Sequence, residues 1–228
     1  MGAHTFLDQL LKTGAGAWAD AQAATGRARA SGDFDKYATG AAVGGVLALL
    51  LGTRRGRSLG GSALKLGSVA AIGALAWKAY QDYQAGQRGA PDATADAGAA
   101  PRFEALPAPE MEQHSRAMLK AMIAAAKSDG HMDERENERV HVELTRTGAD
   151  AATQAWVEAE LKRPIDPAEV AAAATTPEMA AEVYLASLLM ADETTTMERA
   201  YLDELARQLK LAPGLKSDLE ARALAQRG

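Results

Sequence analysis

The sequence contains no cysteine, and aromatic residues make up only 5% of its 228 residues. The absence of cysteine excludes disulfide bonds, thiolate metal ligands and a catalytic thiol. Hydrophobic residues nevertheless reach 47%, so the core has to be built from Ala, Leu, Val and Met. This composition favours close-packed helices over a β-sandwich, which uses β-branched and aromatic residues.

Positive charge is scarce in the second part of the chain. Residues 1–88 carry 10 Lys and Arg against 5 Asp and Glu, a net charge of +5. The whole chain has 25 Lys and Arg and 30 Asp and Glu, so residues 89–228 carry 15 basic and 25 acidic residues, a net charge of −10. The basic part favours an anionic surface as a partner, and the acidic part argues against nucleic acid.

Long uncharged runs are also few. Residues 37–53, "YATGAAVGGVLALLLGT", contain no charge, and residues 59–83 form a second apolar stretch with Lys65 near its start. A transmembrane helix needs about 20 apolar residues, with roughly 17 as the lower limit, so these stretches barely qualify. A cleavable signal peptide is not expected, because a polar, mixed-charge segment precedes the first stretch.

Small residues recur at helix-interface spacing in this apolar pair, and such spacing lets helices approach closely in lipid. The pairs are Gly40 with Gly44, Ala41 with Gly45, Ala63 with Gly67, and Ala70 with Ala74. An arginine-rich turn at 54–57 suits anionic head groups, and Trp77, Tyr80 and Tyr83 suit an interfacial belt. We therefore expect residues 37–83 to form a Gly-rich helical hairpin bound to membrane lipids, as two spans, one span or a re-entrant loop. The alternative is a hairpin packed within a soluble protein.

The rest of the chain predicts an all-α protein. Residues 1–36 form an N-terminal amphipathic and polar helix region, residues 84–110 a flexible linker, and residues 111–228 an acidic helical bundle. Asp166 and Thr176 each precede a proline, a pairing typical of a helix start. The predicted bundle helices are 111–127, 133–147, 151–162, 167–173, 178–191, 196–209 and 213–226.

The stretch "AAAKSDGHMDERENERV", residues 124–140, matches the second half of an EF-hand calcium loop. The residues that align with the first half of that loop lack the oxygen ligands. A related pattern follows at "LLMADETTTMERAYLDELARQLKL", residues 188–211, where an apolar helix again ends at an Asp and the next helix opens with Glu. Facing each other, the two units would bring carboxylates together, the ligands that hard cations such as Ca²⁺ or Mg²⁺ prefer. The candidate metal ligands are Asp129, Asp133, Glu136, Asp192 and Glu198.

The same residues suit helix capping. Asp133 and Glu136 have the spacing of a capping box, and Thr195 or Thr196 is placed to cap the helix that starts near Met197. The pattern fits helix capping alone, and it also fits capping combined with a metal-binding role.

The two acidic stretches resemble the tellurite-resistance TerB-like all-α domain, and the Gly-rich segment is similar to the N-terminal half of a bacterial YebE-like branch. The resemblance implies a helical bundle with a metal-binding acidic surface, held at the bacterial inner membrane. It places the acidic domain in the cytoplasm. It also implicates the five carboxylates above as metal ligands, although Thr194 stands where the family often has an acidic residue.

From these patterns we expect a membrane-associated binding or scaffold protein linked to envelope or metal stress, and not an enzyme. Its partners would be lipids, and a protein partner or a second copy through the small-residue helices, but not nucleic acid. The alternatives are a soluble stress protein whose hairpin mediates oligomerisation and, second, a metal-dependent hydrolase.

Overall fold

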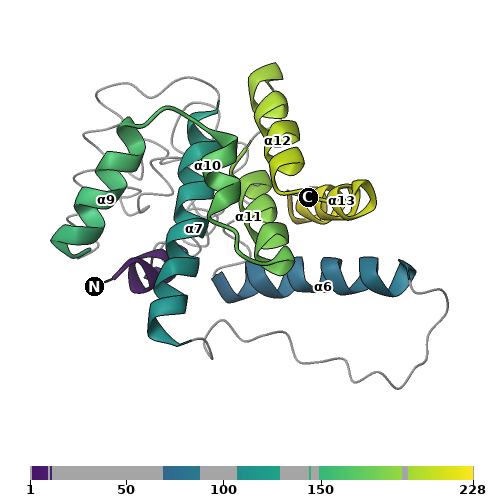
Figure 1. Ribbon diagram of the computed structural model, residues 1–228, viewed down its shortest axis with the longest axis horizontal. Helices are drawn as coiled ribbons and strands as arrows, with labels where there is room; N and C mark the ends of the chain where they lie inside the picture. The colour runs from purple at the N-terminus through teal and green to yellow at the C-terminus, as the bar shows by residue number, and fades with distance from the viewer. Residues whose placement is uncertain are drawn as a thin grey trace, which may run out of the picture.

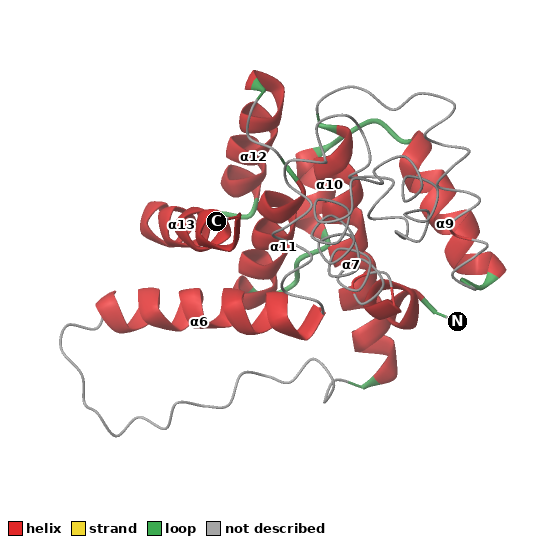
Figure 2. Cartoon of the chain, turned by 180° about the vertical axis from the view of Figure 1, so that it is seen from behind, coloured by secondary structure: helices red, strands yellow, loops and turns green. Residues whose placement is uncertain are grey.

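In the computed structural model, the residues described are 2–9, 11, 69–87, 107–128, 144, 149–191 and 195–227. Every regular element in this part of the chain is a helix, which confirms the predicted all-α class. Figure 1 and Figure 2 show these helices from opposite sides. After a short helix at 3–9, they are α6 (Val69–Gln87), α7 (Ala108–Lys127), α9 (Ala151–Lys162), α10 (Pro167–Ala172), α11 (Pro177–Met190), α12 (Thr196–Gln208) and α13 (Pro213–Arg227).

Helix α11 is the centre of the arrangement. It packs along α7 and also contacts α6, α12 and α13 (Figure 1). Its sequence "PEMAAEVYLASLLM" is apolar on all sides after the first turn, and a helix that is hydrophobic all round has to be surrounded by other elements. Its residues from Met179 onward are accordingly buried, apart from Glu182.

Helix starts follow the predicted caps. The side chain of Asp166 accepts a hydrogen bond from the backbone of Ala168 at the start of α10, and Pro167 is the first helical residue. At the start of α11 the Thr176 hydroxyl accepts from the Met179 backbone at 3.1 Å. These caps satisfy backbone N–H groups that have no partner inside the helix, and they place the helix boundaries close to the predicted ones.

Helix α6 belongs to the bundle. Ile72, Ala76 and Ala79 lie on one face of α6 and are 1%, 0% and 0% exposed, because this face packs on α11 and α13. An ion pair of 2.7 Å between Asp82 and Arg222 joins α6 to α13. The described part of the second half of the predicted hairpin, from Val69 onward, therefore buries an apolar stripe against protein.

The predicted linker is shorter than 84–110 at both ends. Its first residues are the last turn of α6, which ends at Gln87, and its last residues are the first turn of α7, which begins at Ala108. Because α6 and α7 both contact α11, the segment between them joins two helices of one bundle. The uncharged run 37–53 lies outside the described residues. Among the helices that are described, none combines the length and the hydropathy needed to cross a bilayer.

The short N-terminal helix is docked on the same core. Phe6, Leu7 and Leu11 are at most 1% exposed, as the amphipathic pattern of this region predicts. Methionines also fill the core: Met118, Met122, Met179 and Met190 are buried. Met197, in the first turn of α12, is instead 60% exposed.

Candidate functional site

Four of the five predicted metal ligands, Asp129, Asp133, Glu136 and Asp192, lie outside the described residues. The fifth, Glu198, is buried at the start of α12. Within the described ranges, no three His, Asp or Glu side chains lie close enough together to hold a metal ion.

Glu198 forms a capping box with Thr195. The backbone N–H and the hydroxyl of Thr195 donate to Glu198 Oε2 at 3.0 and 2.9 Å, and the Glu198 backbone donates to Thr195 Oγ1 at 3.1 Å. The capping interpretation of this glutamate is therefore confirmed, with Thr195 as the cap. One carboxylate oxygen of Glu198 is already used by these bonds, which leaves the other for any further ligand.

A second buried cap joins the N-terminal helix to α7. The backbone N–H groups of Ala3 and His4 donate to the two carboxylate oxygens of Glu112 at 3.0 and 3.2 Å. A carboxylate at this place satisfies two unpaired helix donors and complements the positive end of the helix. Glycine at position 2 suits this close approach, because a Cβ there would lie 2.8 Å from Glu112 Oε2 and the carboxylate would have to shift.

Glu112 also fixes the guanidinium of Arg116. Arg116 Nε donates to Glu112 Oε1 at 3.1 Å, and the guanidinium carbon lies 5.7 Å from the centre of the Trp156 ring on α9. Burial disfavours the charge of Glu112, but the hydrogen bonds from Ala3, His4 and Arg116 outweigh it and lower the pKa of this carboxyl.

A groove of about 380 Å³ runs between α7 and α9 at this point. Arg116 and Lys120 of α7 line one side, and Trp156, Glu160 and Arg163 line the other. Its volume falls in the range of small-molecule sites, roughly 300–1,000 Å³. We take this groove as the candidate binding site.

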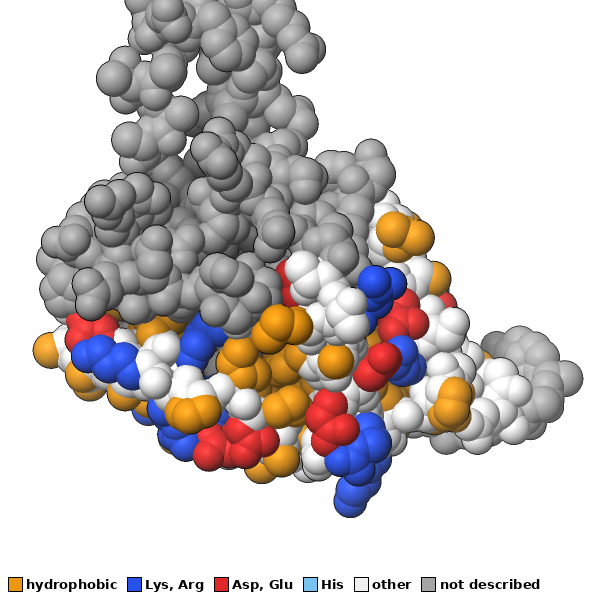
Figure 3. Space-filling model, turned by 90° about the horizontal axis from the view of Figure 1, so that it is seen from above, with side chains coloured by type: hydrophobic (Ala, Val, Ile, Leu, Met, Phe, Trp, Pro, Cys, Tyr) orange, Lys and Arg blue, Asp and Glu red, His pale blue; other side chains and the backbone are white. Residues whose placement is uncertain are grey.

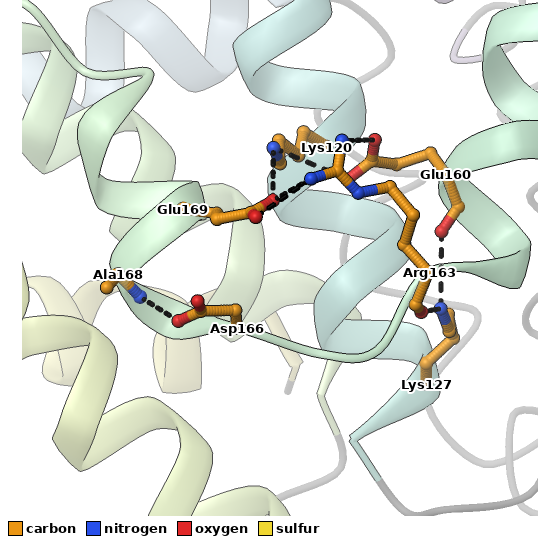
Figure 4. Close-up of polar contacts among 7 residues, drawn as sticks. All are labelled: Lys120, Lys127, Glu160, Arg163, Asp166, Ala168 and Glu169. Atoms are coloured by element: carbon orange, nitrogen blue, oxygen red, sulfur yellow. Dashed lines mark hydrogen bonds and ion pairs between the residues drawn. The ribbon is translucent and has the colours of Figure 1, made fainter.

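Beside the groove, four charged side chains from α7, α10 and the end of α9 pair with one another (Figure 4). Lys120 Nζ lies 3.5 Å from Glu160 Oε1 and 3.3 Å from Glu169 Oε2 on α10. Arg163 Nη2 donates to both carboxylate oxygens of the same Glu169, at 2.8 and 2.6 Å. Hydrogen bonds between two charged groups are stronger than neutral ones, so this network holds α9 and α10 on α7.

Lys127 completes the attachment of α9. Its ammonium donates to the backbone carbonyls of Glu160 and Arg163 at 3.2 and 2.5 Å (Figure 4). The lysine at the end of α7 thus donates to carbonyls at the carboxyl end of α9, where a cation is favourable; the Glu160 carbonyl also accepts the Arg163 backbone N–H. Burial lowers the pKa of this lysine, although Glu160 opposes the shift.

Seen from above, the described surface mixes basic and acidic side chains around apolar ones (Figure 3). The described part of this face lacks a field of a single sign, such as a nucleic-acid backbone attracts. The groove is not recognisable from the sequence, because Arg116 and Trp156 stand in separate predicted helices and share no motif. The available signals were a tryptophan in a chain with few aromatics and basic residues in an acidic domain.

The fold and the groove define an all-helical protein with a candidate binding surface between two helices. The chain belongs to DUF533, a family of proteins of unknown function, whose model matches residues 36–223. It is also similar to an uncharacterised protein encoded in the ampR 5′ region of Yersinia enterocolitica. The two are 28% identical over 110 residues, which cover 48% of this chain and 79% of the relative. No solved structure matches the chain.

We predict that Glu112→Gln makes the free energy of unfolding less dependent on pH in the acidic range. The lowered pKa means that Glu112 stabilises the fold above its ordinary pKa of 4.5 and loses this contribution as pH falls through the folded-state value. The free energy of unfolding of the wild type should therefore fall more steeply below about pH 5 than that of the variant. Urea unfolding at several pH values measures this slope.

The matched control is Glu110→Gln, which removes an exposed carboxylate from the first turn of the same helix. Equal slopes for wild type and Glu112→Gln would show that the carboxylate does not hold the N-terminal helix.

Proposed function

We propose that this protein is a membrane-associated binding or scaffold protein of the bacterial inner membrane. The observation that carries the proposal is the packing of α6 on α11 and α13, through Ile72, Ala76 and Ala79. The uncharged run 37–53 and the arginines at 54–57 come before α6 in the sequence and are separated from it by residues 58–68. Lipid contacts made by those residues would therefore hold the whole bundle at the bilayer surface.

This arrangement changes the role of the predicted linker. If α6 were a membrane segment separate from the bundle, residues 88–106 would set the distance between the bundle and the bilayer. With α6 packed in the bundle, they only return the chain to α7. The proposed scaffold is accordingly a bundle that stays close to the lipid head groups.

A binding role, without catalysis, is supported by how the charged groups around the groove are used. Lys120, Glu160, Arg163 and Glu169 pair with one another across three helices. A general base or nucleophile has to be available to a substrate, whereas these groups are engaged in holding helices together. The mixed charge of the surface in Figure 3 supports a partner other than nucleic acid.

A role in envelope or metal stress follows from the TerB-like resemblance and is proposed on that basis. The alternative, a soluble stress protein that oligomerises through the hairpin, draws on the same packing of α6, because this helix already buries its apolar stripe against protein.

Membrane attachment is tested by flotation of the full chain with vesicles that contain anionic lipid. We expect the wild type to float with the vesicles, and a variant with Arg54, Arg55 and Arg57 replaced by Gln to float less, because each basic residue near an anionic surface contributes about 1 kcal/mol. Replacing the exposed Arg199, Arg207 and Lys210 by Gln is the control with the same loss of charge. Recovery of the wild type in the lipid-free fraction would contradict membrane attachment and favour the soluble alternative.

A divalent cation bound by the acidic segments is a second part of the proposal. Clustered carboxylates suit a hard cation, and the free oxygen of Glu198 fits this role beside the cap. A cation would relieve the mutual repulsion of these groups, which amounts to about 1 kcal/mol per pair at 4 Å in water.

We therefore expect the melting temperature of the full chain to rise with Mg²⁺ or Ca²⁺ by more than with sodium at equal ionic strength. At 100 times the dissociation constant the stabilisation would be about 2.7 kcal/mol. Asp129→Asn and Glu198→Gln should remove the effect, and Gln at 198 keeps a residue that suits the capping box. Glu178→Gln, in the first turn of α11, is the control. Equal shifts with sodium would leave capping as the sole role of these residues.

A further inference from the structure

We propose that the groove between α7 and α9 binds a carboxylate carried on an apolar body, with Arg116 as the residue that receives the carboxylate. This inference is independent of the proposed function, because it rests on the groove alone and needs neither membrane contact nor a cation. The ligand is either a small organic acid or the terminal carboxylate of a peptide, which present the same chemistry.

The charges along the groove leave one group available. Lys120 is paired with Glu160 and Glu169, and Arg163 is engaged through Nη2 with both carboxylate oxygens of Glu169 and through Nη1 with Glu160 at 3.9 Å. Glu112 accepts hydrogen bonds from the N-terminal helix. In the part of the chain that the structure describes, the polar contact of Arg116 is made through Nε, so both of its terminal amino groups are open to a ligand.

Arg116 is also held in position. Glu112 fixes one edge of the guanidinium, and the ring of Trp156 lies 5.7 Å from its carbon atom. Its side chain is still 42% exposed. A guanidinium that is fixed on one edge and accessible on the other matches the planar geometry of a carboxylate with little loss of conformational freedom on binding.

The rest of the lining selects the body of the ligand. Pro109, Ala117, Trp156 and Ala173 contribute apolar surface to the groove. Three basic and two acidic side chains line it, a net charge of +1. A ligand with a single negative charge balances this lining, whereas the second charge of a phosphate would approach Glu112 and Glu160. An apolar monocarboxylate therefore fits better than a phosphate.

The test is a titration of the ¹⁵N-labelled full chain with 3-phenylpropionate and, separately, with N-acetylphenylalanine. The indole N–H signal of Trp156, assigned with Trp156→Phe, is followed by NMR. We expect a saturable shift with at least one acid and none with the corresponding neutral amide. Tighter binding of N-acetylphenylalanine would indicate a peptide terminus, and tighter binding of 3-phenylpropionate a small organic acid.

Arg116→Gln should weaken binding about tenfold or more, as expected for the loss of a charge-assisted contact. Arg116→Lys keeps the positive charge but lacks the planar guanidinium, so its affinity should lie between those of the wild type and Arg116→Gln. Arg207→Gln on α12, whose partner is Glu204, should bind like the wild type. Equal binding of acid and amide, equal binding by Arg116→Gln, or no saturable shift with either acid up to about 10 mM (roughly −2.7 kcal/mol) would overturn the proposal.

Discussion

The structure depends on the burial of α11 on all sides. From Met179 to Met190 this helix offers almost no polar surface to solvent, so it has to be enclosed by neighbours. Helices α6, α7, α12 and α13 supply the enclosure. Of these, α6 comes from a part of the sequence that has the composition of a membrane segment. The need to cover α11 therefore explains why an alanine-rich apolar helix packs on an acidic bundle.

Polar contacts set the arrangement of the helices around this core. Asp82 with Arg222 joins α6 to α13, and His114 with Glu182, 2.5 Å apart, joins α7 to α11. The Lys120 network and the lysine cap at 127 hold α9 on α7. Such contacts stabilise modestly where they are exposed, but they fix position. The groove lies between α7 and α9, which are held together at the carboxyl end of α9, and Trp156 in the middle of α9 lines it.

Much of the fold could be predicted, because local chemistry decides where helices begin and end. Pro167, Pro177 and Thr195 mark starts whose cap geometry the structure confirms. The docking of α6 could not be predicted in the same way, since the stripe of Ile72, Ala76 and Ala79 suits lipid and protein equally well. The groove could not be predicted from the sequence either, because the guanidinium and the indole ring come together only after two separate helices have packed. For the acidic site, Glu198 shows why the sequence leaves two interpretations open: a capping box and a cation site use the same residue types.

The central claim is that α6 is part of the bundle, and the free energy of unfolding of two matched variants tests it most directly. Ala76→Glu places a charge under α11, where Ala76 is fully buried, whereas Ala74→Glu places the same charge on the exposed side of the helix. Urea unfolding should show a loss of about 3–5 kcal/mol for Ala76→Glu, the usual cost of a buried charge without a partner. Ala74→Glu should change stability by less than about 0.5 kcal/mol. Equally small losses for both variants would mean that α6 does not pack on the bundle.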